Sequence, residues 1–105
     1  MKEVIAIIRP EKLSGTRNAV DALATLEAFS QRVLGRGSQA GLHYVQAVAQ
    51  GRRVGMSYLS KQMITWLVPD EHINDVVAAI MRVNQTGNFG DGKVFVCPVE
   101  ITPQL

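Results

Sequence analysis

The order in which apolar, strand-like segments and helical patterns follow one another constrains the fold of this chain more than any other feature. Two strand-like segments, 2–8 and 59–68, each lead into a proline and then into a helical pattern of apolar residues. Apolar, β-branched runs that stop at a turn are typical of strands, and proline suits the first turn of a helix. Each helical pattern leads to a further strand-like segment, 29–34 in the first half and 94–99 in the second. The predicted order of elements is therefore β-α-β-β-α-β.

The two helical patterns differ in regularity. The second has apolar residues at i, i+3, i+4 and i+7, namely Ile73, Val76, Val77 and Ile80. That spacing predicts an amphipathic helix that runs to about Gln85, and we expect Asp70 to cap its start. The first pattern has a looser spacing, at Leu13, Val20, Leu23 and Leu26. We expect this first helix to begin at Pro10 and to end near Leu26.

This order of elements is the ferredoxin-like plan of the α+β class, in which a four-stranded antiparallel sheet carries both helices on one face. A chain of 105 residues fits one hydrophobic core, so we expect a single domain over residues 1–105. The strands do not alternate apolar and polar residues, because 4–8 and 94–97 are apolar throughout. Two helices cover only one side of the sheet, and the other side would expose a larger apolar patch than soluble monomers tolerate. We therefore expect a closed symmetric oligomer.

A long segment, 36–58, separates the second predicted strand from the third. It has no clear hydrophobic period, and connections of this length inside compact domains are usually functional. Its charged residues are Arg36, Arg52 and Arg53, with no acidic residue among them. A basic segment in a chain of nearly balanced charge indicates an acidic or phosphorylated partner.

Two glycine-rich turns lie next to predicted strands, one after 29–34 and one before 94–99. The first holds Gly35, Gly37 and Gly41, and the second holds Gly87, Gly90, Asp91, Gly92 and Lys93. Glycines let the main chain approach a phosphate closely, and a lysine beside them supplies a point charge. Neither turn is a Walker loop or a Rossmann fingerprint, so an ordinary flexible turn is the alternative interpretation of the first.

These motifs together resemble the nitrogen-regulatory PII signal protein family, and the resemblance covers nearly the whole chain. The segments that carry it are 7–10, 35–41, 59–61 and 86–96, together with the long segment 36–58. Segments 9–10, 32–37, 83–87 and 95–100 are most similar to the paralogues associated with nitrogenase regulation.

The resemblance implies a trimer that binds ATP or ADP between its subunits and, with Mg²⁺ and ATP, 2-oxoglutarate. It implies a regulator that acts by binding and not an enzyme, with a T-loop at about 36–58 that engages nitrogenase or an ammonium transporter. The assembly would be a homotrimer or one shared with a paralogue. The nucleotide-binding residues would be Gly35, Arg36, Gly37, Gly87, Gly90, Asp91, Gly92 and Lys93. The residues for Mg²⁺ and 2-oxoglutarate would be Gln39, Gly41 and Lys61, and those of the partner-binding loop Leu42, His43, Tyr44, Arg52 and Arg53.

The chain also departs from the family pattern. PII proteins usually carry an Arg-x-Arg pair just after the last strand, and residues 100–105 contain none. A hydrogen bond to a charged group contributes about 1.5–3 kcal/mol, so nucleotide binding should weaken by on the order of a hundredfold unless Arg36 or Arg52 compensates. Thr65 stands where glutamate is common in the family. A member that binds another small anion or nucleotide is therefore the alternative.

Other classes of function receive less support. RNA-recognition modules share this order of elements, but 61–68 offers only Trp66 for stacking, so we expect no direct nucleic-acid binding. No nucleophile and base can be placed together, and His43 and His72 lack nearby metal-binding partners, so we expect neither catalytic residues nor a structural metal. Cys97, the single cysteine, is expected in the core. With no apolar stretch of roughly 20 residues, we expect a cytoplasmic protein that does not insert into a membrane.

Overall fold

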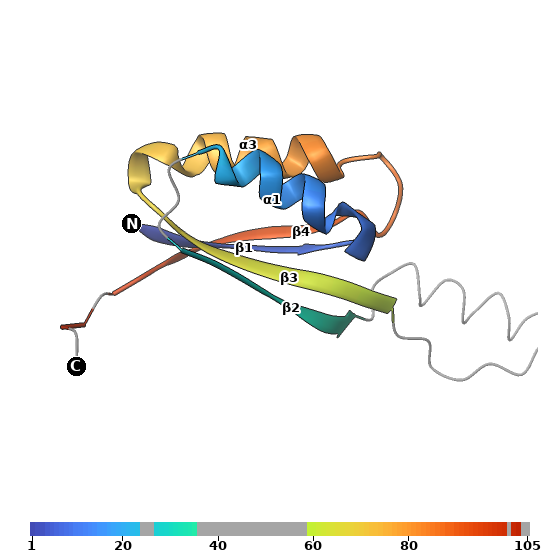
Figure 1. The fold of residues 1–105 in the computed structure, drawn as a ribbon, viewed down its shortest axis with the longest axis horizontal. Coiled ribbons are helices and arrows are strands. Elements are labelled where there is room, and N and C mark those ends of the chain that lie inside the picture. The colour runs from blue at the N-terminus through green and yellow to red at the C-terminus, as the bar shows by residue number, and fades with distance from the viewer. Residues whose placement is uncertain (24–26, 36–58, 101, 104–105) are drawn as a thin grey trace, which may run out of the picture.

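The computed structural model describes residues 1–23, 27–35, 59–100 and 102–103. Its helices and strands are β1 (Lys2–Ile8), α1 (Leu13–Asp21), β2 (Glu27–Gly35), β3 (Leu59–Val68), α3 (Ile73–Asn84) and β4 (Gly92–Pro98). Short 3-10 turns, Pro10–Lys12 and Asp70–His72, precede α1 and α3. The predicted order β-α-β-β-α-β is confirmed (Figure 1).

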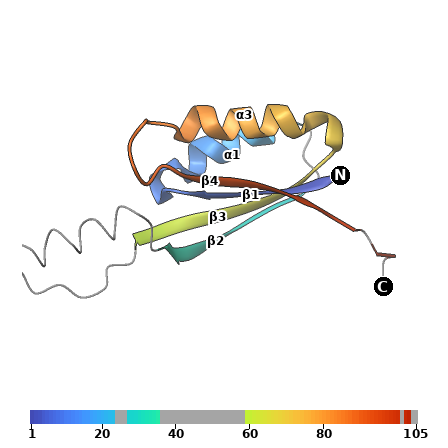
Figure 2. The ribbon, with the colours of Figure 1, turned by 180° about the vertical axis from the view of Figure 1, so that it is seen from behind.

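The four strands form one antiparallel sheet in the order β2-β3-β1-β4. The first strand in sequence thus lies between β3 and β4, and Ile5 of β1 pairs with Thr65 on one side and Phe95 on the other. Both views of the ribbon show α1 and α3 side by side on one face of the sheet (Figures 1 and 2). The ferredoxin-like α+β fold is therefore as predicted.

The core lies between this sheet and the two helices. Alternate residues of β1 and β3 point into it, and Trp66 is the largest fully buried side chain. The strand residues of the core are Val4, Ala6, Ile8, Ile64, Trp66 and Val68, and the helix residues are Val20, Val76, Ala79 and Ile80. The helices pack closely, since a Cβ on Gly15 of α1 would lie 3.3 Å from Val83 Cγ1 of α3.

The other residues of the strands form the second face of the sheet, which no helix of the described chain covers. We call it the open face, and its residues are Glu3, Ile5, Ile7, Phe29, Gln31, Val33, Lys61, Met63, Thr65, Leu67, Lys93, Phe95 and Cys97. Phe29 is 55% exposed and Phe95 45% exposed on this face. Cys97 is half-buried here, so its predicted place in the core is wrong: its neighbouring position Val96 faces the helix side.

Two local details also differ from expectation. Helix α1 ends at Asp21 and not near Leu26, because Leu23 donates its N–H to the Val20 carbonyl and packs on the core from a turn. Residues 24–26 lie outside the described residues. Asp70 does not cap α3, because the 3-10 turn separates the two; its carboxylate instead accepts a hydrogen bond from the Met1 amino group at 2.7 Å.

The segment 36–58, predicted as a T-loop, lies outside the described residues. Strands β2 and β3 lead into it, and Gly35 pairs with Leu59 at the last step of the ladder. In the part of the chain that the structure describes, no helix is long and apolar enough to cross a lipid bilayer.

Candidate functional site

The turn that joins α3 to β4, residues 85–91, is closed by a carboxylate from its own end, and we call it the glycine turn. Asp91 Oδ2 accepts hydrogen bonds from the N–H groups of Thr86, at 2.7 Å, and Gly87, at 3.2 Å. Asp91 Oδ1 accepts a further bond from the Thr86 hydroxyl. These bonds favour the charged carboxylate, so those from Thr86 first, and the Gly87 amide after them, hold the pKa of Asp91 below its ordinary value.

Two cationic side chains from the sheet hold carbonyl oxygens of the glycine turn. Arg9, just after β1, donates from Nη2 to the Phe89 carbonyl at 2.8 Å and from Nε to the Gly90 carbonyl at 3.1 Å. Lys61 of β3 donates from Nζ to the same Gly90 carbonyl at 2.5 Å. Arg9 Nη1 also lies 3.6 Å from Asp91 Oδ1. Arg9 therefore contacts both the carbonyls of the turn and the carboxylate that closes it.

The surroundings of Lys61 disfavour its positive charge. Partial burial is the first cause that lowers the pKa of Lys61, and the nearby Arg9 guanidinium is the second. Glu11 and Asp91 act in the opposite direction. An anion brought beside Lys61 would relieve this repulsion, because an opposite charge a few ångströms away favours the charged form of a lysine.

The glycine turn meets the sheet at Gly92, the first residue of β4. The backbone of Gly92 has a φ of 128°, and a Cβ there would lie 2.0 Å from the Ile7 carbonyl oxygen. Only glycine allows both this conformation and this close approach to β1. Gly92 therefore sets the position of the turn relative to the end of β1, where Arg9 follows.

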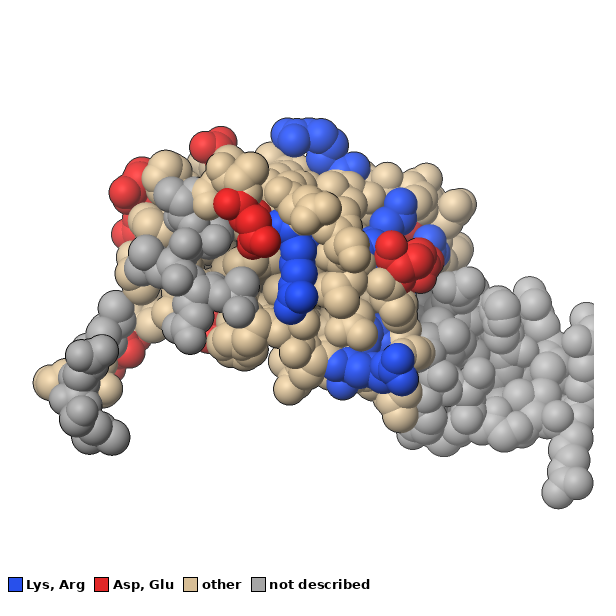
Figure 3. Space-filling model, in the orientation of Figure 1, with Lys and Arg blue, Asp and Glu red and all other residues tan. Residues whose placement is uncertain are grey.

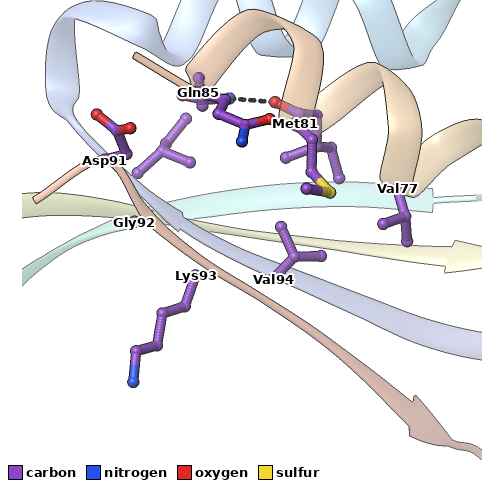
Figure 4. Close-up of a pocket in the computed structure, with 10 residues that line it drawn as sticks. Val77, Met81, Gln85, Asp91, Gly92, Lys93 and Val94 are labelled. Carbon is purple, nitrogen blue, oxygen red and sulfur yellow. Dashed lines mark hydrogen bonds between the residues drawn. The ribbon is translucent and has the colours of Figure 1, made fainter. Parts of the chain in front are cut away.

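A cavity of about 420 Å³ lies between α3 and the start of β4. Its apolar lining consists of Ile8, Val77, Ile80, Met81 and Val94. Figure 4 shows Met81 and Val94 turned toward one another, whereas Lys93 extends from the opposite side of the strand. The register agrees, because Lys93 pairs with Ile7 of the open face. The Lys93 ammonium group thus belongs to the open face, as Lys61 does, and not to the cavity.

Charge is unevenly spread over the surface. Figure 3 shows most of the acidic atoms of this face at the end where α3 begins, and basic atoms in the middle and at the opposite end, where acidic atoms lie beside some of them. Asp70, Glu71 and Asp75 belong to the start of that helix. Arg9 and Lys61 lie at the other end of the strands, beside the glycine turn. This basic end is where an anionic ligand would be attracted.

The predicted ligand residues that the structure describes converge on this end of the sheet. Gly87, Gly90 and Asp91 lie in the glycine turn, and Gly92 and Lys93 follow it directly. Lys61 contacts the turn, and Gly35 ends β2 two residues beyond the residue that pairs with Lys61. The other predicted residues lie outside the described residues: Arg36, Gly37, Gln39, Gly41, Leu42, His43, Tyr44, Arg52 and Arg53.

Two residues of the site were not predicted from the sequence, although both occur in the segments that carried the resemblance. Arg9 and Thr86 make the contacts that shape the glycine turn. The position of Arg9 directly after β1 becomes informative only once the pairing of β1 with β3 is known, because that pairing brings Arg9 beside Lys61. Among residues 1–23, 27–35 and 59–100, no three His, Cys, Asp or Glu side chains gather closely enough to hold a metal ion.

Comparisons with known proteins agree with this arrangement. A family model described as nitrogen regulatory protein P-II matches residues 1–104. The "Nitrogen fixation nifHD region glnB-like protein 2" of Methanococcus maripaludis is 43% identical, over 95% of this chain and 88% of the relative. A protein of the same name from Methanobacterium ivanovii is 44% identical, over 95% of this chain and 87% of the relative. The "Nitrogen regulatory protein P-II 2" of Methanothermobacter thermautotrophicus is 40% identical, over 95% of this chain and 84% of the relative.

The matches extend over almost the full length of the chain, and they include relatives named for nitrogen fixation, as the sequence motifs indicated. With the ferredoxin-like sheet and the glycine turn beside it, they make the assignment plain: the chain belongs to the nitrogen regulatory protein P-II family.

Proposed function

We propose that this protein is a nitrogen-regulatory signal protein that senses ATP or ADP, with Mg²⁺ and 2-oxoglutarate, in clefts between the subunits of a trimer. It is one domain that acts by binding, and residues 36–58 serve as the T-loop through which it controls a target protein. The names of two relatives refer to nitrogen fixation, so nitrogenase is the first target we propose and an ammonium transporter the second.

One observation carries this proposal: two cationic side chains contact the glycine turn, and a third cationic residue follows the turn in the chain. Arg9 and Lys61 both contact the Gly90 carbonyl, and Lys93 lies on the open face two residues after Asp91. A glycine-containing turn lets a ligand approach its backbone, and lysines beside it supply positive charge. Such a turn is suited to an anionic ligand such as a phosphate chain. The carboxylate of 2-oxoglutarate would take the position next to Lys61.

The open face supports the proposal that copies assemble. Phe29 and Phe95 are both about half exposed on it, and Ile5 and Met63 add apolar surface between the strands. Apolar faces of this kind are covered in closed symmetric oligomers. Assembly through this face would bring a neighbouring subunit to the edge where Lys61 and Lys93 lie.

The described residues fit the anions better than they fit the metal. Mg²⁺ takes oxygen ligands, and both carboxylate oxygens of Asp91 already accept hydrogen bonds within the glycine turn. Gln39, which the family resemblance assigns to Mg²⁺ and which lies outside the described residues, would supply a side-chain oxygen to the metal. When bound, the metal would supply positive charge that offsets the negative charge of the phosphates and of 2-oxoglutarate.

Isothermal titration calorimetry with ATP, ADP and 2-oxoglutarate, in the presence of Mg²⁺, tests this function. Replacing Lys93 with methionine removes a phosphate contact and should weaken ATP binding by about tenfold or more. The control is Arg82→Gln, which removes one positive charge from the exposed side of α3 and should change affinity by less than about twofold. A wild-type protein that gives no heat with either nucleotide would overturn the proposal, and binding of a different phosphorylated anion would support a changed ligand instead.

A further inference from the structure

The Gly90 carbonyl receives two cationic donors from two different strands. Ile8 and Gln62 form the last pair of the β1–β3 ladder, and Arg9 and Lys61 lie one step beyond it. The positive charges of Arg9 and Lys61 repel each other at neighbouring positions, which agrees with the lowering of the Lys61 pKa by Arg9. The carbonyl oxygen accepts from Arg9 Nε at 3.1 Å and from Lys61 Nζ at 2.5 Å. One main-chain oxygen thus links two cationic side chains at the site.

The two donors hold this carbonyl in different ways. Arg9 also binds the Phe89 carbonyl through Nη2 and approaches Asp91 through Nη1, so its planar guanidinium grips the glycine turn at three points. Lys61 makes one bond, from a flexible four-carbon stem. Lys61 can therefore leave the carbonyl for another anion at lower cost than Arg9 can.

Asp91 also holds the glycine turn, through backbone N–H groups instead of carbonyls. Its carboxylate binds the N–H groups of Thr86 and Gly87 and lies 3.6 Å from Arg9. The carbonyls of the turn are thus held by Arg9 and its N–H groups by Asp91, and the two clamping side chains attract one another. Loss of Arg9 would free the two carbonyls directly and would leave the Asp91 carboxylate without its nearby cation.

We propose that Arg9 is the positioning residue of the glycine turn. It holds two carbonyls of the turn and lies beside the Asp91 carboxylate, which holds two N–H groups of the same turn. Lys61 adds a single bond, so the turn should keep its shape without Lys61 and lose it without Arg9.

Amide hydrogen exchange of Thr86 and Gly87 tests the positioning role without any ligand. Arg9→Gln should speed their exchange by about tenfold, the change expected when hydrogen bonds to a charged group are lost. Arg9→Lys keeps the positive charge but lacks the several N–H donors of the guanidinium group. Its amide exchange rates should therefore lie between those of Arg9→Gln and wild type. Lys61→Met should change exchange by less than about threefold, because Arg9 still holds the turn.

Core amides of α3, at Val76 and Ile80, separate a local effect from loss of the whole fold. They should exchange at the wild-type rate in every variant. The positioning role is wrong if Arg9→Gln leaves Thr86 and Gly87 unchanged, if Lys61→Met affects them as strongly, or if the core amides speed up by the same factor.

Discussion

Asn84 of α3 donates its side-chain amide to the hydroxyl of Thr16 in α1 at 2.9 Å, and both side chains are buried. The Asn84 amide also donates to the Ile80 carbonyl at 2.8 Å, and the Thr16 hydroxyl donates to the Lys12 carbonyl at 2.7 Å. This chain of bonds joins the two helices through the core. Asn84 is the last residue of α3, so this bond lies directly before the glycine turn.

Replacing Asn84 with alanine should lower the free energy of unfolding by about 2 kcal/mol, because two buried hydrogen bonds are lost and the Ile80 carbonyl loses a partner. Urea unfolding followed by circular dichroism, at equal protein concentrations, measures the change. Asn74→Ala, on the exposed side of the same helix, is the control and should stay within about 0.5 kcal/mol of wild type. Equal losses in the two variants would contradict the role given to the Asn84–Thr16 bond.

Two glycines at the same end of the sheet should respond differently to alanine. Gly92→Ala forces a Cβ against the Ile7 carbonyl oxygen and should cost about 3 kcal/mol or more. Gly87→Ala meets no atom within 4 Å, so only its left-handed backbone, at φ 83°, opposes the change, and the cost should be about 1 kcal/mol. Thermal or urea unfolding of the two variants compares them directly. A Gly92 variant as stable as the Gly87 variant would show that β4 does not approach β1 as described.

Charge placed on the open face should break the proposed assembly. Phe29→Glu or Phe95→Glu puts a carboxylate into an apolar contact, and an unpaired buried charge costs several kcal/mol, so sedimentation should show a smaller particle than wild type. Ala78→Glu is the control, because Ala78 is an exposed apolar residue of α3 on the helix side, and the particle mass of this variant should equal that of wild type. Open-face variants that keep the particle mass of wild type would contradict assembly through this face.

The closure of the glycine turn should depend on pH in one direction. The pKa of Asp91 is lowered in the folded protein, chiefly by the bonds from Thr86, so the stabilisation is present above its ordinary value of 3.8 and is lost as pH falls through the lower folded value. The amide resonances of Thr86 and Gly87 should therefore stay constant from neutral pH to below 3.8 and then move together. Asp91→Asn should abolish this transition, and a wild-type transition at or above 3.8 would contradict the closure.

The bounds of β1 and β3 could be predicted from the sequence because each contains an apolar run that ends within two residues of a proline, Pro10 or Pro69. The end of α1 could not, because Leu23 has the spacing of a helical residue but packs on the core from a turn. Apolar periodicity reports which side chains are buried, and a turn can bury one as well as a helix can.

Part of the candidate site could likewise be predicted from local sequence motifs, and part could not. Local motifs pointed to Gly90, Gly92 and Lys93, since glycines and a lysine within a few residues indicate a phosphate-binding turn. The role of Arg9 depends on contacts with residues about 80 positions away, Phe89 and Gly90, which exist only because β1 lies between β3 and β4. That strand order follows from the whole fold, and no short pattern around Arg9 contains it.

Native mass spectrometry of the protein with ATP, Mg²⁺ and 2-oxoglutarate tests the central claim, that neighbouring subunits together form the nucleotide sites. The account predicts a particle of three chains of 11.5 kDa, retaining up to one nucleotide per chain, and loss of the nucleotide together with the trimer in Phe95→Glu. A single chain that retains nucleotide, or a trimer that retains none with any of these ligands, would contradict it.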